Sequence, residues 1–395
     1  MNVRRTVVVG GVAFSLSTAS LLLPACAADE NDAKLDPEDT EVVVPANDAG
    51  VPDVVDAGGS CRTDDCEFFP DACGADVLCP SGLFDPANPS EGPDWRTRIT
   101  STGGRTATDA WLVGTVGMAA HFDGASWKQA DLGTSESMRF FWLTSAGEVS
   151  FGTLDRLYSR GLGSADASVS PDGWALRGPV SPPGGYGSIL TAAWAMPGSN
   201  LLWLGTSTDL WRLEINGSTF TSRPGIPASV CNNVPCKWLR SLHGASAGTI
   251  WGVGDNGAAV RITGADGDEP KLTVTNPLTW NRLNGVWAVS DKEAWAVGGD
   301  GTILHNDGAQ FAWKAVPDVP TKRHLNAVVG SSSSDVWAVG DAGVVLHFDG
   351  TAWSRVKIAG LGSRRPDLYT VWSPAPGRVW IGGQGVLLAL GGNSP

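Results

Sequence analysis

Three histidines of this chain each stand two residues before an aspartate, and such pairs could supply acid–base catalysis. They are His121 with Asp123, His305 with Asp307, and His347 with Asp349. Nucleophilic hydrolysis would also need an activated serine, which a Gly-x-Ser-x-Gly motif typically presents at a turn from a strand into a helix. No such strand-to-helix turn is expected here, and a pair repeated at one fixed place is typical of architecture. We therefore assign no catalytic residue.

The pairs belong to a longer unit that recurs along the chain. Residues Leu325 to Trp353 read LNAVVGSSSSDVWAVGDAGVVLHFDGTAW, and Leu283 to Trp313 repeat the pattern 42 residues earlier. Short runs of β-branched and aromatic residues alternate with Ser, Asp and Gly, which indicates short strands joined by tight turns. The 51 glycines and the Trp and Val runs oppose a helical repeat of similar period.

A glycine that ends the second strand marks seven such units. It stands at Gly114, Gly152, Gly205, Gly254, Gly298, Gly340 and Gly382, at intervals of 38 to 53 residues. Seven units of about four strands each predict an all-β, seven-bladed β-propeller.

Each unit has the same expected parts. Inner strands are predicted over segments such as 283–289, 325–329 and 368–372, followed by the Trp-x-Val-Gly second strand, a third strand near 303–305 or 344–348, and an outer strand from Trp313 or Trp353. Tryptophans at one place in the unit are predicted to pack between neighbouring blades: Trp251, Trp295, Trp337 and Trp380. The Asp-Gly pairs 123–124, 307–308 and 349–350 supply the positive φ of tight hairpins between third and fourth strands. His243 replaces an inner-strand tryptophan, and His324 lies outside the repeated positions.

The last unit ends at residues 389–395 without an outer strand of its own. We therefore predict that residues between about Leu83 and Arg96 supply this strand and close the ring, which removes an exposed sheet edge.

The N-terminus has the features of an export signal. Arg4 and Arg5 precede an apolar run from Val7 to Leu23 that is too short and too rich in Gly, Ser and Thr for a spanning helix. The sequence Leu23-Pro24-Ala25-Cys26 resembles the lipobox of bacterial lipoproteins, which implies lipidation of Cys26; an ordinary signal peptide cut near residues 25–28 is the alternative. By the same resemblance, the absence of Asp after the cysteine implies an outer-membrane lipoprotein. The body would then face either the cell surface or the periplasm.

Four segments follow from this reading. They are a leader at 1–25, an acidic disordered tether at 26–60, a small cysteine-rich segment at 61–82 and the propeller at 83–395. The tether is rich in Pro, Gly and acidic residues and has no aromatic residue, so it cannot bury enough apolar area to offset the entropy of ordering.

The cysteines other than Cys26 number six, and in an exported chain they predict disulfides. Cys61, Cys66, Cys73 and Cys79 form a cluster with three possible pairings, and Cys231 and Cys236 close a short loop. A zinc site in the cluster is the alternative, but its spacings do not match paired Cys-x-x-Cys ligands and no His is near.

Charge and composition exclude several partners. Residues 95–395 hold 24 Lys and Arg against 23 Asp and Glu, so the body has no basic excess of the kind that binds nucleic acid. No cofactor or metal is expected. Calcium at residues 266–269 is the alternative, but a solvated hairpin tip fits this loop better because it lacks the alternating oxygen ligands of an EF-hand. The body is expected to be a monomer that meets the membrane only through a lipid anchor.

The motif Trp-Ala-Val-Gly-x-x-Gly-x-Ile/Val-x-His-x-Asp-Gly-x-x-Trp resembles the repeat of bacterial secreted propellers related to the photosystem II assembly factor and to the Asp-box, sialidase-type group. The resemblance covers Trp95 to Gly392. It implies a propeller and is nearly silent on activity. A sialidase-like, glycan-directed hydrolase is the catalytic alternative that it raises, with Arg139, Arg240 and Tyr369 at matching places on inner strands.

Propellers usually bind ligands on the face that carries the turns between second and third strands and the starts of inner strands. The sequence predicts a polar, mildly acidic rim there, with candidate residues Arg139, Arg240, Asp255, Asn284, Asp300, Asn326, Asp341, Tyr369 and Gln384. The expected function is a noncatalytic binding or scaffold module that recognises a protein or a glycan through this face.

Overall fold

The structure is a computed structural model that describes residues 66–84, 92–152, 156–163, 169–180, 189–308 and 311–391. The chain divides into two units, Met1–Ser60 and Cys61–Pro395. All described residues belong to the second unit. The predictions for the leader, for Cys26 and for the tether therefore fall outside the described residues.

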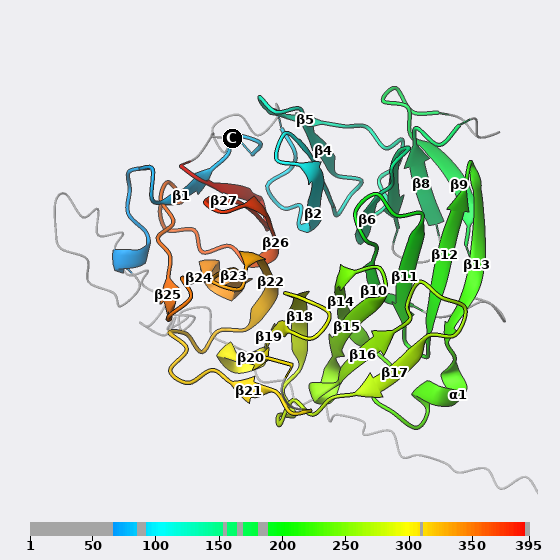
Figure 1. Cartoon of the computed structure of the whole chain (residues 1–395). Helices are drawn as coiled ribbons and strands as arrows, with labels where there is room; N and C mark the ends of the chain where they lie inside the picture. The colour runs from blue at the N-terminus through cyan, green and yellow to red at the C-terminus, as the bar shows by residue number, and fades with distance from the viewer. Residues whose placement is uncertain are drawn as a thin grey trace, which may run out of the picture. The chain divides into compact units, whose positions relative to one another are not determined.

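Seven antiparallel sheets of four strands follow one another around a ring (Figure 1), so the seven-bladed propeller is confirmed. Blades 1 to 4, from inner to outer strand, are β2 (Ile99–Thr106), β3 (Asp109–Gly114), β4 (Ala119–Phe122), β5 (Trp127–Gln129); β6 (Phe140–Leu143), β7 (Glu148–Phe151), β8 (Arg156–Arg160), β9 (Ala175–Pro179); β10 (Leu190–Trp194), β11 (Leu201–Thr206), β12 (Leu210–Asn216), β13 (Thr219–Ile226); and β14 (Leu239–Ser246), β15 (Thr249–Gly254), β16 (Ala259–Thr263), β17 (Lys271–Val274).

Blades 5 to 7 are β18 (Leu283–Ala288), β19 (Ala294–Gly298), β20 (Ile303–Asn306), β21 (Lys314–Ala315); β22 (Leu325–Ser332), β23 (Asp335–Gly340), β24 (Val345–Phe348), β25 (Trp353–Arg355); and β26 (Leu368–Ala375), β27 (Arg378–Gly383), β28 (Val386–Leu390), β1 (Leu78–Pro80). The short helices are η1 (Cys66–Phe68), α1 (Ala228–Cys231), η2 (Asp255–Gly257), η3 (Gly299–Gly301) and η4 (Asp341–Gly343).

The hydrophobic core lies between neighbouring blades. Every residue of β15 and β19 is buried, because these second strands have a sheet packed against each side. Trp251 of blade 4, for example, shares one apolar cluster with Leu283 and Ala296 of blade 5. The repeated tryptophans do pack between blades: the Trp251 and Trp295 rings lie 5.5 Å from those of Trp313 and Trp353 in the next blade.

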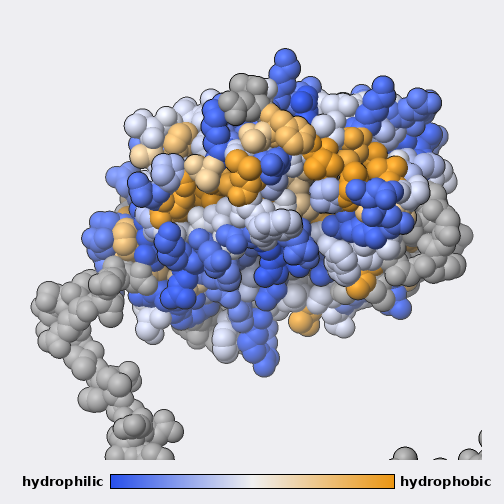
Figure 2. Space-filling model, turned by 90° about the horizontal axis from the view of Figure 1, so that it is seen from below, coloured by the Kyte–Doolittle hydropathy of each residue, from blue (hydrophilic) through white to orange (hydrophobic). Residues whose placement is uncertain are grey.

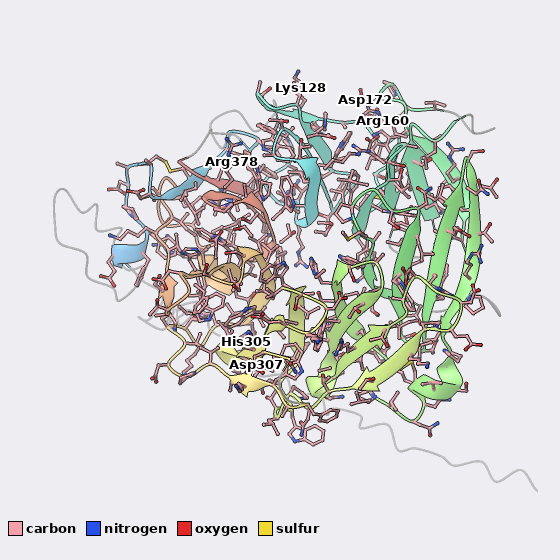
Figure 3. The ribbon with its side chains drawn as sticks, in the orientation of Figure 1. Lys128, Arg160, Asp172, His305, Asp307 and Arg378 are labelled. Carbon is pink, nitrogen blue, oxygen red and sulfur yellow. A yellow bond between two sulfur atoms is a disulfide. The ribbon has the colours of Figure 1, made fainter. Side chains whose placement is uncertain are left out.

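The repeated histidines each bind a carboxylate, but not the aspartate two residues away. In each case Nε2 contacts an acid twelve residues earlier and the ring lies against the directly opposite tryptophan, at ring-centre distances of 4.1 to 4.4 Å. The trios are Asp109–Trp111–His121, Glu293–Trp295–His305 and Asp335–Trp337–His347, with Nε2–O distances of 2.8, 3.0 and 2.7 Å. His305 and Asp307 lie on the outer half of blade 5, away from the ring axis (Figure 3). These histidines hold the blade, as their repetition predicted.

The Asp-Gly pairs are turn residues, as predicted. The carboxylate of Asp349 accepts hydrogen bonds from the backbone N–H groups of Thr351 and Ala352, and Gly350 has a φ of 93°. These N–H donors, that of Ala352 first, hold the pKa of Asp349 below its usual value. Asp123 makes the same bonds to Ala125 and Ser126.

The glycine that ends the second strand in blades 1, 4, 5 and 6 is required by a close approach of the backbone. A Cβ on Gly298 or Gly340 would lie 2.0 or 2.1 Å from the carbonyl oxygen of Arg282 or His324, the residue before the inner strand. The register shows that the equivalent residues in blades 3 and 7 are Thr206 and Gly383. In these two blades the sequence analysis therefore placed the end of the second strand one residue too early, at Gly205 and Gly382.

The N-terminal part of the described chain closes the ring, but through an earlier segment than predicted. β1 pairs antiparallel with β28, with Leu78 opposite Leu390. On the other side of β1, Leu78 N donates to Lys357 O at 3.0 Å and Ala359 N donates to Leu78 O at 2.8 Å. The closing strand therefore lies within the stretch that was expected to be only a cysteine-rich segment.

The prediction of an outer strand at 83–96 is wrong for the part of that stretch that is described. Leu83 and Phe84 are buried and pack against Ile99 and Trp380 at the interface of blades 7 and 1. Thr97 O accepts a hydrogen bond from Gly385 N at 2.8 Å, so this end of the stretch covers the last turn of blade 7. Of the described residues, 83–84 fill the interface between the blades and 92–96 lead into the first inner strand.

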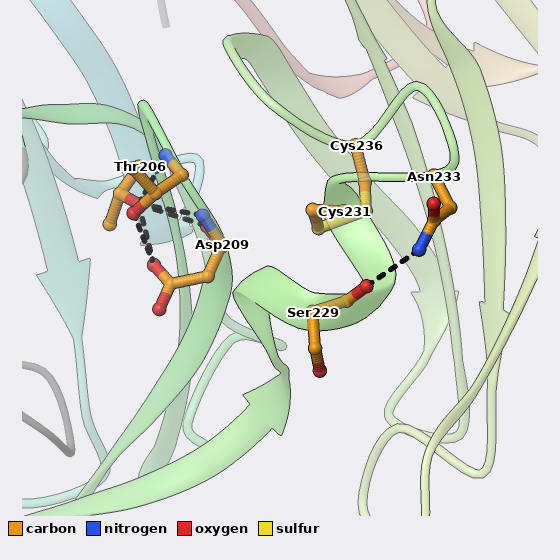
Figure 4. Close-up of a disulfide and its surroundings, with 7 residues drawn as sticks. Thr206, Asp209, Ser229, Cys231, Asn233 and Cys236 are labelled. Atoms are coloured by element: carbon orange, nitrogen blue, oxygen red, sulfur yellow. Dashed lines mark hydrogen bonds between the residues drawn. A yellow bond between two sulfur atoms is a disulfide. The ribbon is translucent and has the colours of Figure 1, made fainter.

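Two of the predicted disulfides are present among the described residues. Cys73 pairs with Cys79, which selects one of the three pairings of the cluster and places a cross-link at β1. Cys231 pairs with Cys236 across the loop that follows α1, where Asn233 Nδ2 also donates to Ser229 O (Figure 4). Cys61 lies outside the described residues.

His243 links two inner strands. Its Nδ1 accepts a hydrogen bond from the backbone N–H of Ala288 in the next blade, at 3.1 Å, and its ring lies beside Trp194. An accepting Nδ1 requires the neutral ring with the proton on Nε2. Burial lowers the pKa of His243 to about 4, so the ring is neutral at pH 7.

We expect Leu78→Ala to destabilise the whole ring, because the side chain is fully buried in β1. Loss of such a leucine costs about 3 kcal/mol of unfolding free energy and lowers Tm by roughly 5 to 10 °C. Thermal unfolding measures this, with Leu176→Ala as the matched control, since Leu176 is also in an outer strand but 38% exposed. Equal melting temperatures for the two variants would contradict closure by β1.

We expect His243 to make stability depend on pH between about 4 and 6.5. The folded pKa lies below the unfolded value, so the unfolded chain takes up the proton first, and the contribution present above pH 6.5 is lost as pH falls. Between pH 7 and 5 the wild type should lose up to about 2 kcal/mol more than His243→Asn. Asn keeps an acceptor but does not titrate, and urea unfolding at both pH values measures the difference. The same loss in both proteins would show that His243 is not responsible.

Candidate ligand-binding face

The candidate residues lie on one face of the ring, which we call the turn face. It consists of the turns between second and third strands and the segments that enter the inner strands. Asp255, Asp300 and Asp341 lie in η2, η3 and η4, and Gln384 lies in the turn between β27 and β28. The remaining candidates occupy the second position of an inner strand or, in blade 2, the residue just before it: Arg139, Arg240, Asn284, Asn326 and Tyr369.

A β-bulge positions these second residues. In blade 6, Leu325 pairs with Gly340 and Ala327 with Val339, which leaves Asn326 between them without a partner in the register. The same shift follows the first residue of the inner strand in blades 1, 3, 4, 5 and 7. A bulge redirects the extra side chain, and here it turns that side chain toward the turn face and the next blade.

Two of the bulge candidates, and Arg139 in blade 2, connect adjacent blades. Asn326 Nδ2 donates to the backbone oxygen of Leu368 in blade 7 at 2.9 Å and to Asp341 Oδ1 at 2.8 Å. Asn284 Nδ2 makes the same bond to Leu325 O at 2.9 Å. In blade 2, Arg139 Nη1 donates to Leu190 O at 2.7 Å. The hydrogen bonds of these three candidate side chains link neighbouring blades, so their first role is structural.

Arg240 and Tyr369 have partners at the face itself. Arg240 Nε lies 2.6 Å from Asp255 Oδ1 within its own blade. The guanidinium of Arg98 lies 4.0 Å from the centre of the Tyr369 ring, and burial raises the pKa of the Tyr369 hydroxyl. With Arg139 in blade 2, the three residues of the sialidase-like alternative stand in separate blades, each with its own partner.

The residue just before each inner strand was missed by the sequence analysis. Arg98, Trp238, Arg282 and His324 occupy this position and are exposed. Their carbonyl oxygens are the atoms that a Cβ on the repeated glycine would meet at 2.0 to 2.5 Å. The repeated glycine was therefore an available signal, because it marks where the neighbouring backbone presses on the second strand.

Several acidic side chains of the rim have partners within the face. Asp255 is paired with Arg240, Asp341 accepts from Asn326, and Asp367 accepts from the backbone N–H of Ala342. Of the three predicted acidic residues, Asp300 is the most exposed, with His324 Nδ1 3.9 Å away. Exposed basic side chains stand in the segments that enter blades 1, 5 and 6, at Arg96, Arg98, Arg282, Lys322 and Arg323.

Other candidate chemistry finds no support among the residues that the structure describes. No group of three or more His, Cys, Asp or Glu side chains there could hold a metal ion, and this includes residues 266–269, where calcium was the less favoured alternative to a hairpin tip. Ser246 stands in a Gly-x-Ser-x-Gly sequence, but this forms the hairpin between β14 and β15, and its hydroxyl donates to Asp291 at 2.6 Å. No described helix is long and apolar enough to cross a membrane.

The flank of blades 4 and 5 carries large exposed apolar side chains. Leu278, Trp280 and Phe311 are 71%, 87% and 60% exposed, and Asn276 N bonds to Phe311 O between the two blades. Hydrophobic patches lie among hydrophilic residues on the side of the ring in Figure 2, which is viewed from below the orientation of Figure 1. The sequence gives no sign of this clustering, since the three residues come from two connections.

Neither a protein-family model nor a curated protein matches the sequence. Among solved structures, YCF48 bound to D1 peptide has a TM-score of 0.57 at 14% identity, over 81% of this chain and 96% of that chain. YCF48 from Cyanidioschyzon merolae has a TM-score of 0.57 at 17% identity, over 74% and 95%. Virginiamycin B lyase from Staphylococcus aureus has a TM-score of 0.54 at 13% identity, over 74% and 94%. The chain is thus a β-propeller that resembles the photosystem II assembly factor group in fold.

Proposed function

We propose that the chain is a noncatalytic binding module that holds a segment of a partner protein on the turn face. The observation that carries this proposal is the position of Arg98, Trp238, Arg282 and His324. Each is exposed, and each directly precedes a buried first residue of an inner strand. Different side chains thus stand at equivalent places around the ring axis, where the scaffold itself is constant.

The chemistry of these residues suits an extended peptide. An arginine presents several N–H donors in a plane, which match backbone carbonyls and carboxylates. A tryptophan supplies a large contact area and is enriched in the centres of protein interfaces. YCF48 bound to D1 peptide supports the proposal, because it is a propeller of this fold with a peptide bound.

The scaffold holds these side chains in place without a ligand. The tight contact between each carbonyl and the repeated glycine fixes the backbone, and the bulge residues tie each blade to the next. A face that is ordered before binding loses little entropy on binding. We therefore expect the propeller to bind without rearrangement of its strands.

We expect peptides selected from a random 12-residue library on the purified chain to depend on this face. In the double variant Arg98→Ala, Arg282→Ala, their affinity should fall at least tenfold, or about 1.4 kcal/mol. Isothermal titration calorimetry measures the change. Arg378→Ala is the matched control, since Arg378 is exposed at the far end of β27 from the turn face (Figure 3).

Two outcomes would reject the proposal. One is selected peptides that bind the double variant as tightly as the wild type. The other is a library that yields no binder, together with glycan binding or glycoside turnover that is lost in Arg139→Ala or Arg240→Ala.

We further propose that the module is exported and anchored through a lipid on Cys26, at the outer membrane or the cell surface. The support is the basic and apolar leader followed by Leu23-Pro24-Ala25-Cys26. The acidic stretch at 27–60 would extend through repulsion of like charges and hold the propeller away from the lipid.

We expect labelled palmitate to be incorporated into the wild type and not into Cys26→Ser when both are expressed in a bacterial host. Release of the variant into the soluble fraction should accompany the loss of label. Cys66→Ser is the control, because it also removes a cysteine but leaves the lipobox intact. Label retained in Cys26→Ser would refute the anchor.

A further inference from the structure

A pocket of about 450 Å³ opens between blades 3 and 4, on the face opposite the turn face. Its lining comes from the strands of blade 3, from the β10–β11 hairpin, and from two connections of blade 4. Trp194, Met196, Arg212, Glu214, Asp266 and Asp268 are the residues that define its chemistry. None of them belongs to the proposed peptide-binding face.

The pocket lies where blade 3 departs from the repeat. In blades 1, 5 and 6 the corresponding place is filled by the carboxylate–Trp–His trio. Register puts Leu201, Trp203 and Arg212 at those three positions in blade 3, so both the acid and the histidine are missing. Blade 4 also lacks the trio and has Arg261 opposite Trp251. In blade 3, Trp203 and Arg212 both line the pocket.

Arg212 is a buried cation at this opening. The residue is 5% exposed; Nε donates to Pro224 O at 2.8 Å and Nη1 to Gly267 O at 2.6 Å. Within the described ranges no carboxylate forms an ion pair with it. Burial, and then the nearby Arg223, hold its pKa below the usual value. A buried guanidinium that bonds only to carbonyl groups favours a further acceptor in the pocket.

The rest of the lining is polar, nearly balanced in charge, and aromatic on one side. Arg223 is paired with Glu214, which leaves Asp266 and Asp268 beside Arg212. Two arginines against three carboxylates give the pocket no excess positive charge for a phosphate or other polyanion. Trp194 and the exposed Met196 supply an apolar wall.

We propose that this pocket binds a carbohydrate, one or two pyranose rings in size. A pyranose has an apolar C–H face that packs on an indole ring and an edge of adjacent hydroxyls that both donate and accept. Carboxylates accept from such hydroxyls, and a guanidinium donates to them in a plane. The volume lies within the range of small-molecule sites. This inference does not depend on peptide binding at the turn face.

The test is saturation-transfer NMR on the full chain with glucose, galactose, N-acetylglucosamine, cellobiose and chitobiose, followed by calorimetry on any sugar that binds. We expect at least one sugar to bind with Kd of about 1 mM or tighter, as for small polar ligands. Ala247→Trp should fill the pocket and weaken binding at least tenfold. Ser333→Trp is the matched control, since it changes the corresponding hairpin of blade 6, and it should leave Kd unchanged.

Asp268→Asn keeps the shape of the pocket and should weaken binding at least threefold while Tm stays within 2 °C of the wild type, as for a surface change. No signal from any of the five sugars at 10 mM would overturn the proposal. So would equal binding by Ala247→Trp, or binding of citrate or inorganic phosphate in place of sugar. The Arg98→Ala, Arg282→Ala variant should bind sugar normally, which separates this result from the fate of the proposed function.

Discussion

The whole structure depends on the burial of both faces of small, four-stranded sheets. No blade can do this alone, because its second strand is apolar on both sides, as in the fully buried β15 and β19. Each blade therefore needs two neighbours, and a row of blades satisfies this requirement at its ends only by closing into a ring. The first and last described strands accordingly share one sheet, with β1 beside β28.

This requirement explains why so many conspicuous residues serve the scaffold. Trp295 faces Trp353 of the next blade, His305 stacks on Trp295 and binds Glu293, and Gly298 admits the carbonyl of Arg282. Each contact recurs because each interface between blades presents the same problem. Residues at these places could do chemistry by their type, but they stabilise the fold. Function is therefore to be sought where a blade differs from its neighbours.

Much of the fold was predictable from the sequence, because the same pattern recurs in several units and each position could be compared with its equivalents. The blade count, the turn role of Asp349 and the packing role of Trp251 all followed from comparison of the units. The closing strand was not predictable at its true place: β1 has three residues, among them Cys79 and Pro80, and neither the cysteine nor a residue without an N–H indicates a strand. Its pairing with residues 388–390 depends on contacts across the whole chain.

The turn face was predictable as a region of the fold but not in its detail. The sequence placed Asn326 and Asp341 at one face, but the bulge that turns Asn326 toward Leu368 depends on the register between strands. The pocket of blade 3 could not be predicted from the sequence for a related reason. Arg212 donates to the carbonyl of Gly267, which belongs to another blade.

The most direct test of this view is hydrogen-exchange mass spectrometry of the full chain with and without a peptide selected on it. The account predicts new protection at residues 94–98, 238–240 and 282–284, where the blades differ, and none at β4, β20 and β24, which carry the repeated histidines. Protection concentrated at the repeated histidines, with none at the segments that enter the inner strands, would contradict it.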